Sequence, residues 1–196
     1  MKRRRMLQMF KSAAEVGNFD DVPVLPPQVD PQVHLSRNVV DQPFYLICGK
    51  DTVLAHMSGE ARLVLKNSPV NYFTLHPGDN TYVPAGTPHR VLIGSESVQL
   101  RYRAQDAGLE GVAWYCPGCD DELHRVEWDT AETMSQQAWH DACTQFNGDD
   151  GLRTCRGCDA RHPRIEMTAF ESWLVVAAEL TAERAKLADA GKPDIS

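Results

Sequence analysis

Short runs of apolar, β-branched and aromatic residues dominate the chain between residues 33 and 104. Turn-forming Gly, Pro, Asn, Asp and Ser residues separate these runs, and no helical period comes between them. Strands at such close spacing are typical of a jelly roll or small barrel. The pattern therefore predicts an all-β fold with strands at 33–35, 43–48, 52–56, 61–66, 71–75, 80–84, 89–93 and 97–103.

The segment before this region has a different pattern. Residues 1–18 favour a short helix with Met6, Met9 and Phe10 on one face. Residues 19–32 are rich in proline, which disfavours a helix and favours an extended arm lying along a surface.

Helical periodicity appears only after the predicted barrel. Residues 105–113 are expected to form a linker, and residues 123–128 alternate like a strand. Residues 130–146 are typical of an amphipathic helix with Thr130 as its N-cap. The clearest helix is predicted at 168–190, and its large apolar residues require a partner surface on the barrel or on another subunit.

Two Cys-x-x-Cys motifs supply the candidate chemistry. Cys116 and Cys119 form the first, and Cys155 and Cys158 form the second. Two such pairs can bring four thiolates to the corners of one tetrahedron, which fits zinc and iron alike. The alternatives are a pair of disulfides or a thioredoxin-type redox pair. Disulfides need an oxidising compartment, so the doubled spacing favours a metal site.

Composition limits the class of function. The chain has 196 residues and a net charge of −7, which argues against general nucleic-acid binding. The short basic run at residues 2–5 is interpreted as a solvated tail. No apolar run reaches membrane-spanning length, and no apolar stretch follows the basic N-terminus, so a cytoplasmic protein is expected. The remaining cysteines, Cys48 and Cys143, are expected to be small buried residues.

A second motif lies inside the predicted barrel. Gly78, Pro84, Gly86 and His89 have the spacing of a tight turn, a strand, a second turn and an inward-facing imidazole. This spacing resembles the second half of the cupin signature, and a hairpin with an incidental histidine is the alternative.

The region around the cysteines carries a wider resemblance. The stretch from Glu110 to Cys119, the following His124, the second cysteine pair and His162-Pro163 resemble bacterial 3-hydroxyanthranilate 3,4-dioxygenase. The similarity runs from about residue 33 to 163. It implies a cupin homodimer with a catalytic Fe(II) in the barrel and a rubredoxin-like iron on the four cysteines. Such enzymes open the ring of an aminophenol carboxylic acid with O2.

The resemblance suggests four parts of the chain. These are an N-terminal arm at 1–32, a cupin jelly-roll barrel at 33–110, a rubredoxin-like four-cysteine region at 111–164, and an added C-terminal helix at 165–196.

The chain departs from the family at the barrel iron. A facial triad needs two His and one carboxylate. The corresponding positions hold Ser36, Gln42 and His89, so His89 alone remains as a candidate catalytic residue. Arg101 stands where the family has an inward-facing Glu, and Phe44 keeps its aromatic character.

These replacements suggest a diverged, metal-free pocket for a small aromatic or anionic carboxylic acid. Arg101, if it points inward, is a buried cation that needs an anionic partner. It would bind the carboxylate, with Gln42, Phe44, Tyr45 and His89 as further contacts. In the alternative, Arg101 faces solvent and the barrel is simply filled, because a one-residue shift of register reverses the face.

Two other functions remain open from the sequence. One is an active ring-cleaving dioxygenase whose ligands have moved, with His34, Asp41 and His89 as a rebuilt triad. The other is a non-catalytic interaction protein in which the cysteine site is a structural staple.

Overall fold

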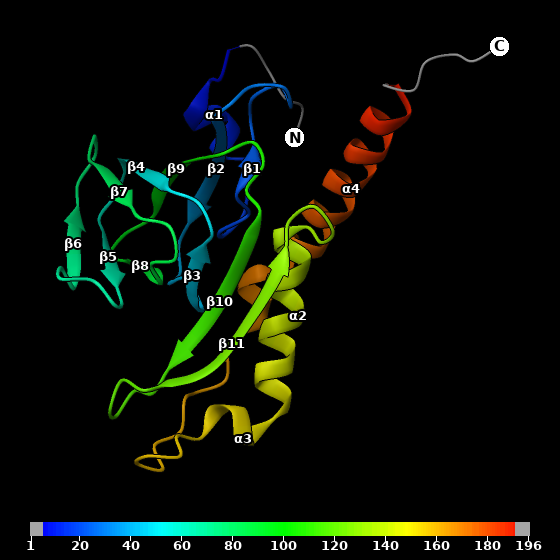
Figure 1. Cartoon of the computed structure of the whole chain (residues 1–196). Coiled ribbons are helices and arrows are strands. Elements are labelled where there is room, and N and C mark those ends of the chain that lie inside the picture. Colours follow the sequence, from blue (N-terminus) through cyan, green and yellow to red (C-terminus); the bar gives the residue numbers. More distant parts are fainter. Residues whose placement is uncertain (1–5, 191–196) are drawn as a thin grey trace.

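Two antiparallel sheets face each other in the computed structural model, which describes residues 6–190 (Figure 1). The first sheet has the strand order β1 (Val22–Pro23), β2 (Gln32–Asn38), β9 (Ser97–Arg103), β4 (Thr52–Ser58) and β7 (Asn80–Val83). The second has the order β11 (Glu122–Asp129), β10 (Leu109–Tyr115), β3 (Tyr45–Cys48), β8 (His89–Ile93), β5 (Ala61–Leu65) and β6 (Tyr72–Leu75). Each predicted barrel strand corresponds to one of β2 to β9, which confirms the all-β cupin prediction.

The first sheet carries many polar side chains on its inner face, which is unusual. Arg101 pairs with His34 on one side and with Leu54 on the other, so these side chains share one face of the sheet. Leu54 belongs to the core shared with the second sheet, so that face is the inner one. Buried polar residues cover much of it: Gln32, Ser36, Asn38, His56, Gln99, Arg101 and Arg103.

The outer face of the same sheet is apolar. Leu35, Leu100 and Ala55 lie there in register. They pack against the N-terminal segment, including Ala13 of α1 (Met9–Ala13) and Val22 of β1. The N-terminal arm therefore covers an apolar sheet face, and the barrel interior keeps the polar groups.

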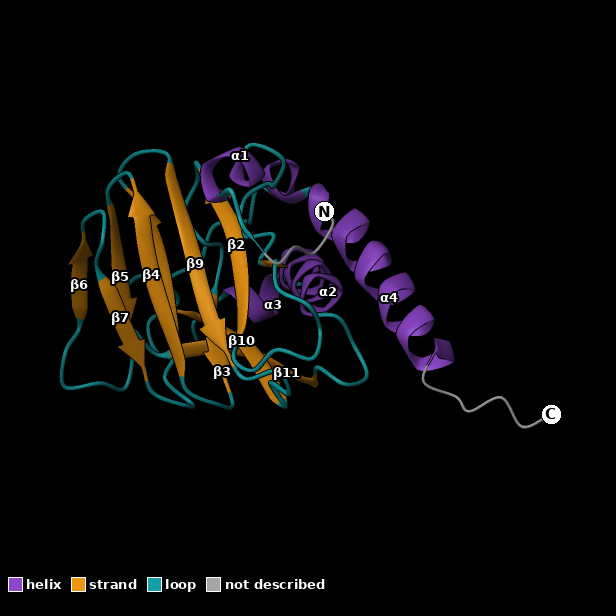
Figure 2. Cartoon of the chain, turned by 90° about the horizontal axis from the view of Figure 1, so that it is seen from above, coloured by secondary structure: helices purple, strands orange, loops and turns teal. Residues whose placement is uncertain are grey.

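Helices close the open side of the sandwich. The hairpin of β10 and β11 extends past the barrel strands, and α2 (Ser135–Gly148) lies along it (Figure 1). The short α3 (Asp150–Arg153) follows α2. The last helix, α4 (Ser172–Ala190), packs on α2, so that α2 lies between α4 and β10 (Figure 2).

Aromatic packing explains why these helices bury their apolar sides. The Trp173 ring is completely buried, 5.5 Å from Trp139 of α2 and 5.9 Å from Phe44 (centroid to centroid). The partner surface of the C-terminal helix thus includes α2 and Phe44, just before β3, in the same chain.

Several boundaries differ from those expected. β10 begins at Leu109, inside the expected linker at 105–113. Thr130 is not the N-cap of α2, because its hydroxyl donates to the carbonyl of Gly108 at 2.9 Å and closes a loop instead. A 3-10 turn (Met167–Phe170) replaces the first turn of the expected C-terminal helix. The basic run at residues 2–5 and the end of the chain beyond residue 190 lie outside the described residues.

Within residues 6–190, no helix is both long enough and apolar enough to cross a membrane.

Candidate functional site

The four cysteines of the paired motifs meet in one cluster. Cys116 and Cys119 lie in the turn between β10 and β11, while Cys155 and Cys158 follow α3. The Sγ atoms of Cys116 and Cys158 are 3.4 Å apart, and all four Sγ atoms lie within 4.8 Å of one another. A tetrahedral ion with metal–sulfur bonds of about 2.3 Å places its sulfurs roughly 3.8 Å apart. The cluster can therefore hold one zinc or iron ion.

Backbone amides turn toward the sulfurs, as the motif predicts. The N–H of Gly118 donates to Cys116 Sγ at 3.3 Å, and the N–H of Gly157 donates to Cys155 Sγ at 3.4 Å. Desolvation raises the pKa of Cys116, but the amides of Cys119 and Gly118, together with the side chains of Cys158 and Cys119, outweigh it and lower the pKa to about 6. This thiol is thus poised to bind a cation as a thiolate.

A stack of rings joins the cysteine cluster to the protein core. Trp114, just before the first motif, stacks on Phe146 of α2 with centroids 4.3 Å apart. His124 stacks on the Trp114 ring, and His162 meets Phe146 edge to face. Both histidines are therefore packing residues beside the cluster.

The barrel contains a charged network around His89 and Arg101. His89 is fully buried, and its Nε2 lies 2.8 Å from Nη1 of Arg101. Since a guanidinium can only donate, Nε2 accepts and Nδ1 carries the proton, which it donates to the Thr87 carbonyl at 3.0 Å. Burial, together with the Arg101 charge, lowers the pKa of His89 to about 3. The imidazole is neutral.

The anionic partner of Arg101 is a residue of the N-terminal arm. Arg101 Nε donates to Asp21 Oδ2 at 3.0 Å, and the two side chains are only 3% and 6% exposed. Arg101 thus points inward, with the buried carboxylate partner that a buried cation needs. The sequence analysis did not identify Asp21. Its only signal is its place in the acidic Asp20-Asp21 pair before the prolines.

The three positions that the resemblance assigns to a barrel iron, Ser36, Gln42 and His89, make other contacts in the structure. The Gln42 amide donates from Nε2 to the carbonyls of Phe44 and His89. The Ser36 hydroxyl accepts from Asn38. The Nε2 atom of His89 faces the Arg101 guanidinium. Two neutral groups and one imidazole beside a fixed cation do not fit a facial triad.

The side chains of the relocated triad, His34, Asp41 and His89, do not form a metal-binding group either. His34 Nδ1 contacts the Asp21 carbonyl at 2.8 Å, whereas Asp41 is exposed and accepts from the Ile93 N–H at 2.7 Å. In the described part of the chain, the four cysteines are the only group of three or more residues placed to share a metal.

The two predicted aromatic ligand contacts, Phe44 and Tyr45, pack against other rings. Phe44 packs among the tryptophans, with its centroid 5.8 Å from that of Trp139. Tyr45 is the next residue and faces the other way, edge to face with Tyr115 at 5.0 Å. Direct contacts therefore join the His89 ring to Arg101, and the Gln42 amide to the His89 carbonyl. The rings of Phe44 and Tyr45 are not part of this network.

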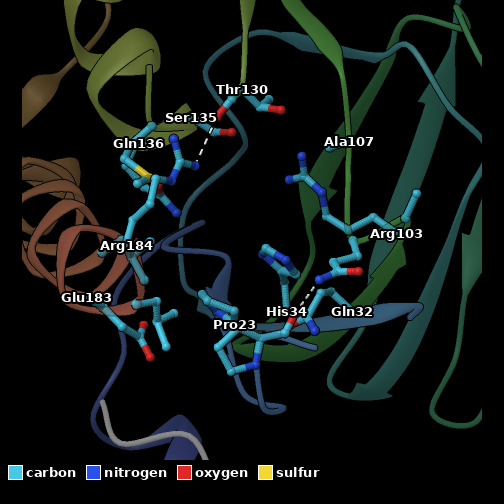
Figure 3. A pocket seen from close by; sticks show the side chains of 16 residues that line it. Pro23, Gln32, His34, Arg103, Ala107, Thr130, Ser135, Gln136, Glu183 and Arg184 are labelled. Atoms are coloured by element: carbon cyan, nitrogen blue, oxygen red, sulfur yellow. Dashed lines mark hydrogen bonds between the residues drawn. The ribbon is translucent and has the colours of Figure 1, made fainter. Parts of the chain in front are cut away.

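A cavity of about 260 Å³ opens at the mouth of the barrel, between β1, β2, the start of α2 and α4 (Figure 3). Arg103 and Arg184 project from opposite walls, His34 lies between them, and Gln136 lies on the same side as Arg184. Arg103 binds Glu110, which also accepts from Ser135. We call this cavity the mouth pocket. Apolar residues complete its lining: Pro23, Pro27, Ala104, Ala107, Met134, Leu180 and Leu187.

Sequence comparison finds no matching family model, but several similar proteins. The 3-hydroxyanthranilate 3,4-dioxygenase of Bacillus thuringiensis is 33% identical over 88 residues, which are 43% of this chain and 48% of that protein. The enzyme of the same name from Meyerozyma guilliermondii is 29% identical over 85 residues, covering 42% and 49%. That from Brucella anthropi is 27% identical over 113 residues, covering 55% and 61%. The chain thus spans about half the length of the first two relatives.

Structural comparison finds remote neighbours. A cupin-2 domain protein from Shewanella frigidimarina matches 51% of this chain and 94% of its own, with 15% identity and a TM-score of 0.44. A hydroquinone 1,2-dioxygenase matches 52% and 81%, with 17% identity and a TM-score of 0.43. The two sheets give the chain a cupin-type fold, and about half of its sequence has a distant likeness to the 3-hydroxyanthranilate 3,4-dioxygenases.

Proposed function

We propose that this chain is a diverged cupin that binds a small aromatic carboxylic acid through a buried guanidinium, without a barrel iron. The observation that carries the proposal is the contact of Arg101 with a carboxylate inside the barrel, at 3.0 Å. The fold already accommodates an acid group at this point, and neutral His89 completes the polar surroundings.

The charge at the site supports an anionic ligand. A buried guanidinium disfavours a divalent cation beside it, because like charges repel strongly where water is excluded. The same guanidinium offers planar donors that match a carboxylate. Recognition of the acid group would thus rest on the side chain of Arg101.

The polar inner face of the barrel supports a ligand rather than a filled core. Among the described residues, Gln42 Oε1, Thr52 Oγ1 and Ser97 Oγ are buried without a hydrogen-bond partner. Buried polar atoms are rarely left unsatisfied, so water or a ligand is expected to reach them. The aromatic character of the acid is inferred from the names of the similar enzymes.

The cysteine cluster has a separate role in this proposal. It would hold a structural zinc or iron ion that ties the β10–β11 turn to the segment after α3. Its binding free energy would contribute directly to folding.

Metal analysis and ligand binding together test the proposal. Protein purified without oxygen and supplied with Fe(II) is expected to hold about one metal per chain, retained in His89→Gln and lost in Cys116→Ser. Calorimetry is expected to detect benzoate but not neutral benzamide. The double variant Arg101→Met/Asp21→Asn, which removes both charges, is expected to bind neither.

Oxygen uptake separates the proposal from its main competitor. With 3-hydroxyanthranilate and Fe(II), no uptake is expected. A second metal that disappears in His89→Gln, accompanied by oxygen uptake, would instead establish an iron dioxygenase with relocated ligands.

A further inference from the structure

The N-terminal arm lies outside the barrel at Val16 and again at Val22, and the residues between them enter the barrel. Val16 and Val22 belong to the apolar cluster on the outer face of the first sheet. Phe19, between them, belongs to the inner core with Phe44 and Leu46. The segment 17–21 therefore passes over the edge of the sheet, inserts an aromatic ring and a carboxylate, and returns.

Its backbone is held in an unfavourable conformation. Phe19 and Asp21 have φ angles of +51° and +43°. A side chain in this left-handed region costs roughly 1 kcal/mol or more, least for Asp and Asn. Such strain persists only where neighbouring contacts impose it.

Both helices supply those contacts. Gln136 of α2 donates from Nε2 to the Asp20 carbonyl at 2.6 Å. Ser172 of α4 donates to Asp20 Oδ1 at 2.6 Å, and the Trp173 indole donates to the Asn18 carbonyl at 3.0 Å. Contacts from α2 and α4 thus clamp the segment, and Asp21 is directed at Arg101.

We propose that the segment 17–21 is an internal stand-in for the ligand, in which the Asp21 carboxylate occupies the acid subsite on Arg101. This inference rests on the proposed function. It names the ligand class more closely: a monocarboxylate that enters through the mouth pocket and displaces Asp21.

The mouth pocket offers the route. His34 and Gln136 line it, and both contact the carbonyl of Asp21. His34 also stands opposite Arg101 in the β2–β9 register. Withdrawal of Asp21 would therefore connect the pocket to the buried guanidinium. A volume of about 260 Å³ lies just below the usual lower limit of roughly 300 Å³ for ligand sites, which restricts the occupant to a small molecule.

Competition follows from this arrangement. A carboxylate on the same chain has a high effective concentration at Arg101, so a free acid must outcompete it. The apparent affinity of the wild-type protein is reduced by the small fraction of molecules in which Asp21 has left the site.

The experiment compares benzoate binding by the wild-type chain and Asp21→Gly. Glycine adopts the positive φ without strain, and its missing side chain leaves room for a free carboxylate. We expect Asp21→Gly to bind benzoate at least about tenfold more tightly, and benzoate but not benzamide to raise its melting temperature. Glu96→Gln, which removes the carboxylate of an exposed pair with Arg37, is the matched control and should bind as the wild type does.

Ser172→Ala is the second variant, in case Asp21→Gly does not fold. It loosens the clamp on Asp20 and leaves the Asp21–Arg101 contact in place, so a several-fold gain in benzoate affinity is expected. Equal affinity in the wild type and these variants would overturn the stand-in and leave the proposed function intact. Absence of benzoate binding in the wild type and in every variant would overturn the proposed function itself.

Discussion

Asp21 and Arg101 lie 80 residues apart in the sequence and meet inside the barrel, with 3.0 Å between Oδ2 and Nε. Both side chains are almost completely buried. The pair joins the N-terminal arm to the strand β9 at the centre of the first sheet. Neither charge has ready access to water, so each depends on the other.

Arg101→Met is expected to lower the free energy of unfolding by about 3–5 kcal/mol, because it leaves the Asp21 carboxylate buried and unpaired. The double variant Arg101→Met/Asp21→Asn should recover much of that loss, since it buries no net charge. Urea denaturation of the single and double variants measures the coupling. Arg37→Met, at an exposed pair, should change stability by less than about 1 kcal/mol. An equally small change in Arg101→Met would show that the buried pair is not formed.

His89 predicts a specific dependence of stability on pH. Its pKa falls from the ordinary 6.5 to about 3 on folding, so between these values the unfolded chain binds the extra proton. Stability is therefore full above pH 6.5 and is lost as the pH falls toward 3. This one group accounts for about 2 kcal/mol between pH 6.5 and 5.

His89→Gln isolates that contribution, because glutamine can still accept from Arg101 but does not titrate. Denaturation curves at several pH values should show a shallower acid loss in the variant than in the wild type. Parallel losses in both proteins would mean that His89 is not buried in the neutral form.

Cys116→Ser is expected to lose the bound metal and to unfold at a lower temperature, because metal affinity at such a centre is folding free energy. Cys143→Ala is the control: Cys143 is also buried, but it lies in α2, away from the cluster. It should retain the metal. Elemental analysis and thermal denaturation of both variants provide the comparison, and unchanged metal content in Cys116→Ser would refute the cluster.

Trp173→Ala should destabilise the protein by about 3–5 kcal/mol, as expected for a large ring removed from a core. Trp173 contacts Trp139, Phe44 and Phe170, and it anchors α4 to the rest of the chain. Val175→Ala, two positions along the same helix at a side chain that is 61% exposed, should have an effect within about 0.5 kcal/mol. Similar effects of the two substitutions would indicate that α4 is loosely attached.

Local sequence patterns are sufficient to predict the barrel strands and the cysteine cluster. Alternation and turn residues act over a few positions, and paired cysteines need only their spacing to predict a tetrahedron. The sequence also allows Arg101 to point inward, where a buried guanidinium needs an anionic partner.

The source of that anion could not be deduced in the same way. The chain has 27 Asp and Glu residues, and nothing local to Asp21 marks it as the partner of a side chain on β9. Long-range pairing depends on the path of the arm, which is set by contacts from α2 and α4. Phe44 and Tyr45 illustrate a different lesson: neighbours on a strand face opposite ways, so both could not line the same pocket.

The covering of the first sheet by the arm has a practical consequence. Leu35, Leu100 and Ala55 form the surface on which the N-terminal segment packs. A protein trimmed to begin at residue 33, where the predicted barrel starts, would present this surface to water. Contiguous apolar patches of this kind promote self-association. The N-terminal segment, which lies outside the predicted barrel, is therefore expected to keep the two packed sheets from aggregating.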